Sequence, residues 1–285
     1  MTIAYLNGSF LPLSEARVSV LDRGFLFADG VYEVIPVYGG RPFHLQQHLL
    51  RLERSLSAIL LDNPKSADDW SAMIERLLAL GKGGDQMLYI QVTRGASEGR
   101  SHALPAQPRP TVLAFCQPLP QMPDSVRTQG VGAITLPDTR WRHCDVKSIA
   151  LLGNVLLANQ ALNVGCNEAL LTRDGHLTEG ASSNVFVVRD DVISTPPNGK
   201  ELLPGITRDL ILKLAQQVGL QTCERPIATE ELAVADEIWI SSSTRELYAV
   251  TQLDGQAIGN QQPGPLWQKV YDAFQVFKQQ YATQS

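Results

Sequence analysis

The stretch Leu203-Pro204-Gly205-Ile206-Thr207-Arg208-Asp209 is a turn that leads directly into an amphipathic helix, expected over Thr207–Val218. The first backbone N–H groups of such a helix have no partner within the helix, and with the helix dipole they attract an anion. The hydroxyl of Thr207 adds a donor at the same end. The stretch therefore indicates a phosphate site at a helix start. A plain helix N-cap is the alternative.

A lysine and a carboxylate precede this stretch. Lys147 lies in Cys144-Asp145-Val146-Lys147-Ser148-Ile149-Ala150, beside an apolar run, and Glu179 follows 32 residues later. A lysine that enters a dry environment is either paired or more easily deprotonated, and a neutral amine is a nucleophile towards carbonyls. The rival is Lys213, which helical spacing places on the exposed side of its helix. A surface charge is the alternative for Lys147.

Composition narrows the class of protein. The chain has 285 residues, 44% of them hydrophobic and 19% charged, which is typical of a globular protein with one large or two smaller domains. A net charge of −5 argues against nucleic-acid binding. No apolar run has the length of a membrane span, and no signal peptide is evident, so we expect a cytoplasmic protein that binds no membrane. Four scattered cysteines fit a reducing compartment.

Hydrophobic periodicity predicts two α+β or α/β domains. We expect an N-terminal α/β domain over residues 1–118, a proline-rich linker over 119–131 and a C-terminal domain over 132–285 that carries Lys147. The helices are expected at 43–60, 68–80, 152–163, 207–218 and from 265. The strands are expected at 31–38, 86–93, 111–116, 184–188, 192–195 and 237–241, after an N-terminal hairpin with an Asn-Gly turn.

Further side chains add anion-binding capacity. Arg51 lies on the first long helix, one turn beyond His48, and could reach a phosphate, although a solvated arginine is the plainer interpretation. Ser243 and Thr244 belong to a hydroxyl-rich loop after a strand, which would suit the same anion, but serine-rich turns are common.

Arg100 and His102 are two residues apart on a loop, where together they could hold a carboxylate. An exposed turn is the alternative. His44 and His48 are spaced like metal ligands, but no acidic third ligand is evident, so we expect no metal site.

A lysine, a carboxylate and several anion donors together suit pyridoxal 5'-phosphate, whose aldehyde, ring nitrogen and phosphate need these three kinds of partner. At this point the sequence resembles the class IV, pyridoxal-phosphate-dependent aminotransferases. The residues that match the family's signature in order and spacing are Glu179, Asn184-Val185-Phe186, Ile193-Ser194-Thr195 and Leu203-Pro204-Gly205-Ile206-Thr207-Arg208. The likeness extends from Leu6 to near the C-terminus.

The resemblance implies a fold-type IV homodimer of two-domain chains with the cofactor at the domain interface. It implies that Lys147 is the Schiff-base lysine and proton shuttle, and that Glu179 contacts the pyridine nitrogen. Leu203 is expected against the ring face. The residues expected around the phosphate are Arg51, Ile206, Thr207, Ser243 and Thr244.

Within the family, the sequence is most similar to the branch that acts on D-amino acids, which holds the substrate α-carboxylate with a strand tyrosine and an Arg-x-His loop. These would be Tyr32, Arg100 and His102. The implied reaction is a ping-pong exchange of the amino group between a D-alanine-like amino acid and a 2-oxo acid such as 2-oxoglutarate or pyruvate. The alternatives are a branched-chain L-amino acid aminotransferase, an aminodeoxychorismate lyase on the same scaffold, and a cofactor-free binding protein.

Overall fold

The computed structural model describes residues 2–81 and 83–283 and divides into two compact units. Unit 1 contains the chain up to Leu119, the segment Val146–Leu151 and the C-terminal residues from Tyr281. Unit 2 contains Pro120–Asp145 and Leu152–Gln280. The mixed α/β composition confirms the expected fold class, and each unit has a sheet of its own.

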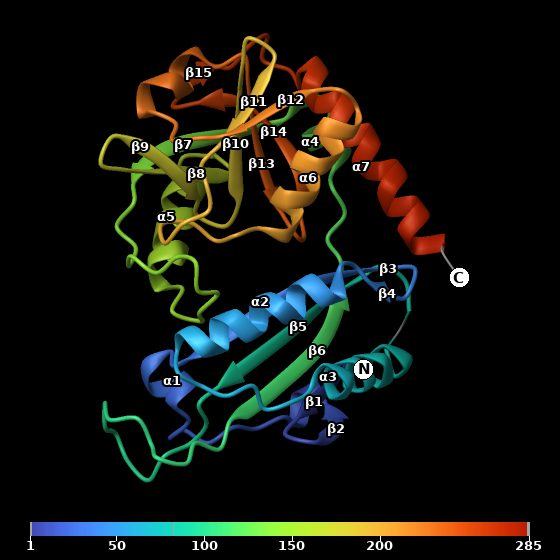
Figure 1. Cartoon of the computed structure of the whole chain (residues 1–285), viewed down its shortest axis with the longest axis vertical. Helices are drawn as coiled ribbons and strands as arrows, with labels where there is room; N and C mark the ends of the chain where they lie inside the picture. The colour runs from blue at the N-terminus through green and yellow to red at the C-terminus, as the bar shows by residue number, and fades with distance from the viewer. Residues whose placement is uncertain (1, 82, 284–285) are drawn as a thin grey trace. The chain divides into compact units, whose positions relative to one another are not determined.

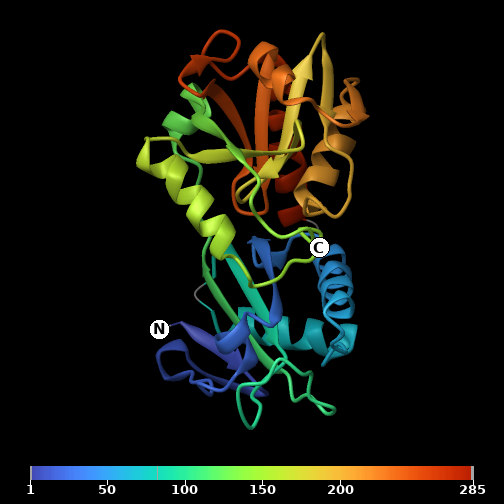
Figure 2. The same cartoon turned by 90° about the vertical axis from the view of Figure 1, so that its left-hand side faces the viewer.

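Unit 1 is built on an antiparallel sheet with the strand order β2-β1-β6-β5-β3-β4. Its strands are β1 (Ile3–Leu6), β2 (Ser9–Pro12), β3 (Gly30–Tyr38), β4 (Arg41–Pro42), β5 (Gln86–Thr93) and β6 (Thr111–Pro118). Its helices are α1 (Arg23–Phe27), α2 (Leu45–Ala58) and α3 (Ala67–Ala79), with a 3₁₀ turn at Leu13–Glu15. Figures 1 and 2 show α2 and α3 on one face of this sheet.

The core of unit 1 lies between that face and the two helices. Helix α2 contributes Leu49, Leu52 and Leu56 at helical spacing, and α3 contributes Trp70 and Ile74. Val31, Ile35 and Val37 of β3 belong to the same core, because every second residue of a strand lies on the same face. Burial of each large apolar side chain contributes roughly 2 kcal/mol, so the side chains that the two helices and the sheet bury together stabilise this unit.

Unit 2 is built on a mixed sheet with the order β12-β11-β10-β13-β14-β7-β8-β9, and β15 pairs with β14. Its strands are β7 (Val131–Pro137), β8 (Glu168–Arg173), β9 (His176–Gly180), β10 (Asn184–Arg189), β11 (Val192–Thr195), β12 (Gln221–Glu224), β13 (Glu237–Ser242), β14 (Glu246–Leu253) and β15 (Gln256–Ala257). Its helices are α4 (Asp124–Gln129), α5 (Leu152–Asn163), α6 (Ile206–Gln217) and α7 (Pro265–Thr283) up to Gln280, with a 3₁₀ turn at Thr229–Val234.

The boundaries of the units differ from the expected domains in two ways. The expected linker contains α4, and its residues from Pro120 onwards belong to unit 2. The segment Val146–Leu151, which carries Lys147, belongs to unit 1. The reason is local: β4 pairs only with Val37 and Tyr38, so the other half of that edge of β3 accepts the Lys147 segment.

Candidate active site

Lys147 is fixed to unit 1 through its backbone. Tyr32 N donates to Lys147 O at 3.0 Å, and Lys147 N donates to the Ser55 hydroxyl at 3.2 Å. Ile149 N donates to Gly30 O at 3.1 Å. A Cβ at Gly30 would lie 2.7 Å from Val92 O and 3.1 Å from the Ile149 side chain, so glycine permits this close approach. The geometry presents a half-buried lysine at the edge of β3.

Lys147 is close to Tyr32, another residue expected at the site. The Lys147 Nζ lies 4.3 Å from the centroid of the Tyr32 ring, within the range of a cation–π contact. Both side chains are half-buried. The structure therefore brings together the expected proton shuttle and one of the three expected carboxylate ligands.

A buried charge cluster lies on α2 and β3. The Glu33 side chain is fully buried and accepts hydrogen bonds from Arg51 Nε and Nη2 at 2.7 and 2.8 Å. Its Oε2 lies 2.7 Å from His48 Nδ1. Burial alone would raise the pKa of Glu33, but Arg51 and His48 hold that pKa well below its usual value. Burial lowers the pKa of His48, and the charge of Lys147 contributes to this lowering.

This cluster changes the interpretation of Arg51. Arg51 is 3% exposed, so it is not a solvated helix arginine. The hydrogen bonds from its Nε and Nη2 to Glu33 fix the orientation of its guanidinium group. Sequence reasoning did not identify Glu33, although a signal exists, since Val31, Glu33 and Ile35 alternate and place the carboxylate on the core face of β3.

Glu179 in unit 2 is buried and held on both oxygens. Arg140 Nη1 donates to Oε1 at 2.6 Å, and Leu203 N donates to Oε2 at 3.0 Å. Asn184 Nδ2 lies 3.4 Å from Oε2 and donates to Leu203 O at 2.9 Å. Burial raises the pKa of Glu179 to about 7, although Arg140 and the Leu203 amide act to lower it. Glu179 is therefore a carboxyl group that titrates near neutral pH.

Arg140 is a site residue that sequence reasoning missed. Its Nε and Nη2 donate to the two oxygens of Asp138, each at 2.9 Å. The Asp138 carboxylate also accepts from the Thr178 hydroxyl at 2.9 Å and pairs with Arg173. Burial opposes the charge of Asp138, but the hydrogen bond from Arg140 keeps its pKa low. This fixed pair directs the remaining nitrogen of Arg140 at Glu179.

The expected phosphate donors of unit 2 lie at one turn and one loop. Helix α6 begins at Ile206 after Gly205, which has no side chain to cap the first amides. A Cβ at Gly205 would lie 1.9 Å from Asn184 Oδ1, so only glycine fits beside the amide that holds Glu179. Ser243 and Thr244 lie in the turn between β13 and β14.

The donor set fits a phosphorylated, basic ring. Ser241, near the end of β13, has a buried hydroxyl with no hydrogen-bond partner among the described residues. A buried polar group normally has a partner, so this hydroxyl is available to a ligand. Glu179 is a buried carboxyl group of the kind that a basic ring nitrogen needs as a partner, and the Leu203 amide donates to it. These features suit pyridoxal 5'-phosphate.

The two remaining expected residues, Arg100 and His102, are exposed on the connection between β5 and β6. Both lie next to Phe27 of α1. Within the described part of the chain, no hydrogen bond or ion pair joins either residue to Tyr32 or Lys147. The structure therefore groups Arg100 with His102, and Tyr32 with Lys147, within unit 1.

The protonation of Glu179 should be visible in stability measurements. Burial raises the pKa of Glu179 to about 7 in the folded state, from an ordinary value of 4.5. The folded state therefore binds a proton in this window that the unfolded state has lost, so stability falls as the pH rises through it, by on the order of 3 kcal/mol. We expect the ligand-free protein to lose stability relative to Glu179→Gln between about pH 5 and pH 8 in urea unfolding. Parallel pH profiles for the two proteins would contradict this assignment.

Comparison with known proteins identifies the family. A family model for amino-transferase class IV matches residues 30–253, which include Lys147, Glu179 and the start of α6. The chain belongs to the class IV aminotransferases. The D-alanine aminotransferase of Bacillus licheniformis is 42% identical over 269 residues, 94% of each chain. That of Staphylococcus epidermidis is 37% identical over 99% of this chain and 100% of the relative.

Solved structures confirm the fold-type IV architecture. The branched-chain amino acid aminotransferase of Escherichia coli matches with a TM-score of 0.91 at 25% identity, over 96% of this chain and 93% of the other. That of Thermoproteus uzoniensis matches with a TM-score of 0.87 at 26% identity, over 98% and 95% of the two chains.

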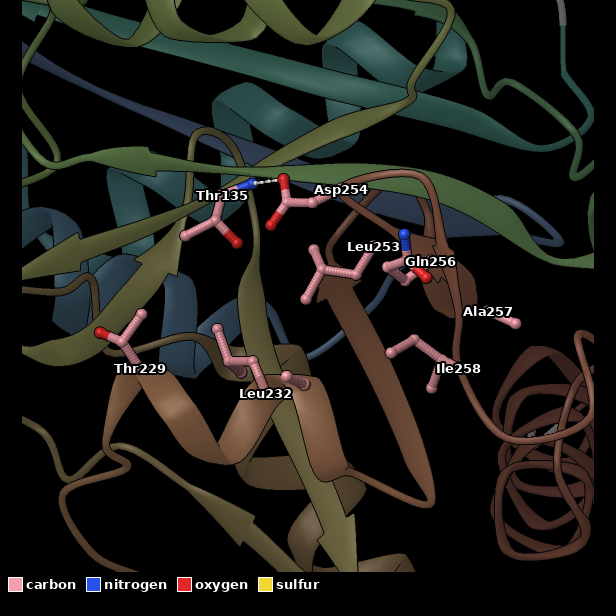
Figure 3. A pocket seen from close by; sticks show the side chains of 9 residues that line it. Thr135, Thr229, Leu232, Leu253, Asp254, Gln256, Ala257 and Ile258 are labelled. Carbon is pink, nitrogen blue, oxygen red and sulfur yellow. Dashed lines mark hydrogen bonds between the residues drawn. The ribbon is translucent and has the colours of Figure 1, made fainter.

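This class IV aminotransferase also has a pocket of about 370 Å³ in unit 2 (Figure 3). Thr135 N donates to Asp254 Oδ1 at 2.7 Å on its wall, as the dashed line shows. The lining residues are Thr135, Thr229, Leu232, Ala233, Leu253, Asp254, Gln256, Ala257 and Ile258. None of the candidate active-site residues lines it, and three of the lining side chains belong to the core of unit 2.

Proposed function

We propose that this aminotransferase exchanges an amino group between a D-amino acid of the D-alanine type and a 2-oxo acid, 2-oxoglutarate or pyruvate, with pyridoxal 5'-phosphate as cofactor. The observation that carries this proposal is the near full-length match to D-alanine aminotransferases at 42% and 37% identity. A branched-chain L-amino acid aminotransferase is the second candidate, because the solved structures above carry that name. It is the weaker candidate, because these structures are only 25% and 26% identical to this chain, against 42% and 37% for the D-alanine aminotransferases.

The residues of unit 2 fix the cofactor's orientation in this proposal. Bound pyridoxal 5'-phosphate supplies an aldehyde that accepts the amino group and a ring that withdraws electrons from the substrate Cα. Glu179 keeps the ring nitrogen protonated, and Arg140 keeps Glu179 in place. Leu203 covers one ring face. The phosphate is held by the first amides of α6 at Ile206 and Thr207 and by Ser243 and Thr244, and the likeness to the family adds Arg51 as a further phosphate ligand.

Lys147 carries the proton transfer in this proposal. Its backbone is fixed on both sides, through Tyr32 N and the Ser55 hydroxyl, so only its side chain has to move. The Nζ removes the proton from the substrate Cα as a general base and delivers it again as a general acid. The contact with the Tyr32 ring stabilises the protonated form between these two events.

The substrate carboxylate is held by Tyr32, Arg100 and His102. Arg100 offers a planar fork of donors, and His102 lies two residues further along the same loop. A carboxylate is common to all amino acids and 2-oxo acids, so one clamp serves both half-reactions.

Arg100→Ala should mainly raise the KM for D-alanine. A charge-assisted bidentate contact is worth roughly 2 kcal/mol, which corresponds to about a 30-fold loss of kcat/KM. Because the contact is made before and during the reaction, kcat should change much less. Steady-state kinetics at varied D-alanine concentration measure both constants. A fall in kcat at an unchanged KM would contradict a role in carboxylate binding.

Initial rates test the proposed reaction as a whole. With D-alanine and 2-oxoglutarate both varied, we expect pyruvate formation with parallel double-reciprocal lines, as ping-pong kinetics require. Each pyruvate should require one 2-oxoglutarate. Sustained pyruvate formation from D-alanine, beyond one pyruvate per active site and without a 2-oxo acid acceptor, would contradict a transaminase.

We also propose that the enzyme is a cytoplasmic homodimer. The free thiols of Cys116, Cys144, Cys166 and Cys223 suit a reducing compartment. On α5 and just after it, several large apolar side chains are exposed, a surface that a second copy would cover. They are Leu152, Val155, Leu156, Leu162 and Val164. Among the described residues, no helix combines the length and the hydrophobicity that a membrane span requires.

A further inference from the structure

The side chains of Arg100 and His102 both contact the aromatic ring of Phe27. The guanidinium carbon of Arg100 lies 5.0 Å from the centroid of the Phe27 ring. The imidazole of His102 lies 5.3 Å from the same ring at an interplanar angle of 59°. One aromatic side chain therefore contacts both of the proposed carboxylate ligands on this loop, although each of the two is exposed to solvent.

A buried arginine fixes the backbone of the same loop. Arg23 is 4% exposed, and its Nη1 donates to Ser101 O at 2.6 Å and to Ala103 O at 3.3 Å. These two carbonyl groups flank His102 in the sequence. The guanidinium carbon of Arg23 also lies 4.9 Å from the Phe27 ring centroid. Arg23 thus contacts both the loop and the Phe27 ring.

Arg94, the first residue of the loop, is held by the same carboxylate that binds Arg23, that of Asp29. Arg23 Nε donates to Asp29 Oδ2 at 2.8 Å, and Arg94 Nε and Nη2 donate to the two Asp29 oxygens at 2.8 and 3.0 Å. Burial would raise the pKa of Asp29, but hydrogen bonds from Arg94 and Arg23 keep it low. Asp29 therefore remains an anion. It pairs both with Arg94, at the start of the loop, and with Arg23, which binds the loop on either side of His102.

Helix α1 is itself firmly placed. The Asp22 carboxylate accepts from Gly24 N at 2.8 Å, as an N-cap, and from the Thr111 hydroxyl at 2.7 Å. A Cβ at Gly24 would lie 2.3 Å from Thr93 Cγ2, so the helix lies tightly against the end of β5. In Figure 1, α1 lies beside the connection between β5 and β6.

We propose that Phe27 and Arg23 are positioning residues for the substrate carboxylate clamp: they hold the guanidinium of Arg100 and the imidazole of His102 in the geometry that receives the carboxylate. This inference rests on the proposed function of Arg100 and His102. The physical reason is entropic, because an arginine on a free loop must be ordered when substrate binds, whereas one already stacked on a ring needs less ordering. Neither Phe27 nor Arg23 has to touch the substrate.

The test compares variants of Phe27 in the holoenzyme. Phe27→Leu removes the ring and should raise the KM for D-alanine roughly five- to tenfold, the fold-change expected for a lost cation–π contact, with kcat changed less than about twofold. Phe27→Met is the second variant, because it keeps an apolar side chain of similar length without a ring. Phe27→Tyr keeps the ring and should restore the KM. Phe25→Leu is the matched control, since Phe25 lies on the same helix and is 73% exposed.

A double-mutant cycle with Arg100→Ala separates positioning from general damage. If Phe27 acts through Arg100, Phe27→Leu should raise the KM much less in the Arg100→Ala background than in the native one. Additive effects, or an unchanged KM in Phe27→Leu and Phe27→Met, would overturn the inference while leaving the clamp intact. If Arg100→Ala itself leaves the KM unchanged, the proposed clamp fails, and the role of Phe27 fails with it.

Discussion

Replacement of Lys147 by alanine is expected to abolish transamination of D-alanine, with a fall in kcat of at least about three orders of magnitude. The variant loses both the amine that bonds to the cofactor aldehyde and the base that moves the Cα proton. In the structure, Tyr32 is the aromatic neighbour of the Lys147 Nζ, and its ring does not replace a primary amine. Pyruvate formation in the presence of 2-oxoglutarate measures the loss.

The matched control is Lys213→Ala. Lys213 is exposed on α6, and its removal should leave kcat within about twofold of the native value, because surface substitutions of this kind usually have small effects. Borohydride reduction followed by peptide mass spectrometry should find the cofactor on Lys147 in the native enzyme. A Lys147→Ala variant that works at a normal rate would show that another residue carries the chemistry.

Glu179→Gln is expected to lower kcat by about two to three orders of magnitude, comparable to the loss of one preorganised electrostatic partner of a reacting group. Glutamine can accept a hydrogen bond but carries no charge, so it no longer favours a protonated ring nitrogen. The neighbouring geometry should survive, because Arg140 remains paired with Asp138 and Asn184 remains bonded to Leu203 O. Steady-state kinetics with cofactor in excess measure the effect.

Glu230→Gln serves as the control for this change. Glu230 belongs to the same unit and is exposed, so the same substitution there should leave kcat unchanged. If Glu179→Gln retained more than about a tenth of the native kcat, the proposed role of Glu179 at the ring nitrogen would be wrong.

Much of the fold could be predicted from the sequence because periodicity reports local burial. The helix expected over 43–60 is α2 at Leu45–Ala58, and the strand expected over 31–38 is β3 at Gly30–Tyr38. The assignment of Val146–Leu151 to unit 1 could not be predicted. It depends on backbone hydrogen bonds to the free edge of β3. Such bonds are made by groups that do not depend on the side chain, so they leave no pattern in the sequence.

The residues of the candidate site could be predicted only in part from the sequence, for a related reason. Lys147, Glu179 and the α6 turn stand out as motifs, whereas Arg140 and Glu33 act through partners that are far away in the sequence. Arg140 reaches Glu179 across 39 positions, and Glu33 reaches Arg51 across 18. Phe27 appears in the sequence as one more apolar helix residue. Only its contacts with Arg100 and His102 give it a role.

The most direct test of the proposed function is the first half-reaction, in which the holoenzyme is mixed with one amino acid and no 2-oxo acid. The absorbance spectrum then shows whether the bound cofactor is converted to its amine form. We expect D-alanine to convert the cofactor fully, and L-alanine and L-valine to leave it unchanged. Conversion by L-valine with no response to D-alanine would contradict a D-amino acid aminotransferase and would identify the branched-chain alternative.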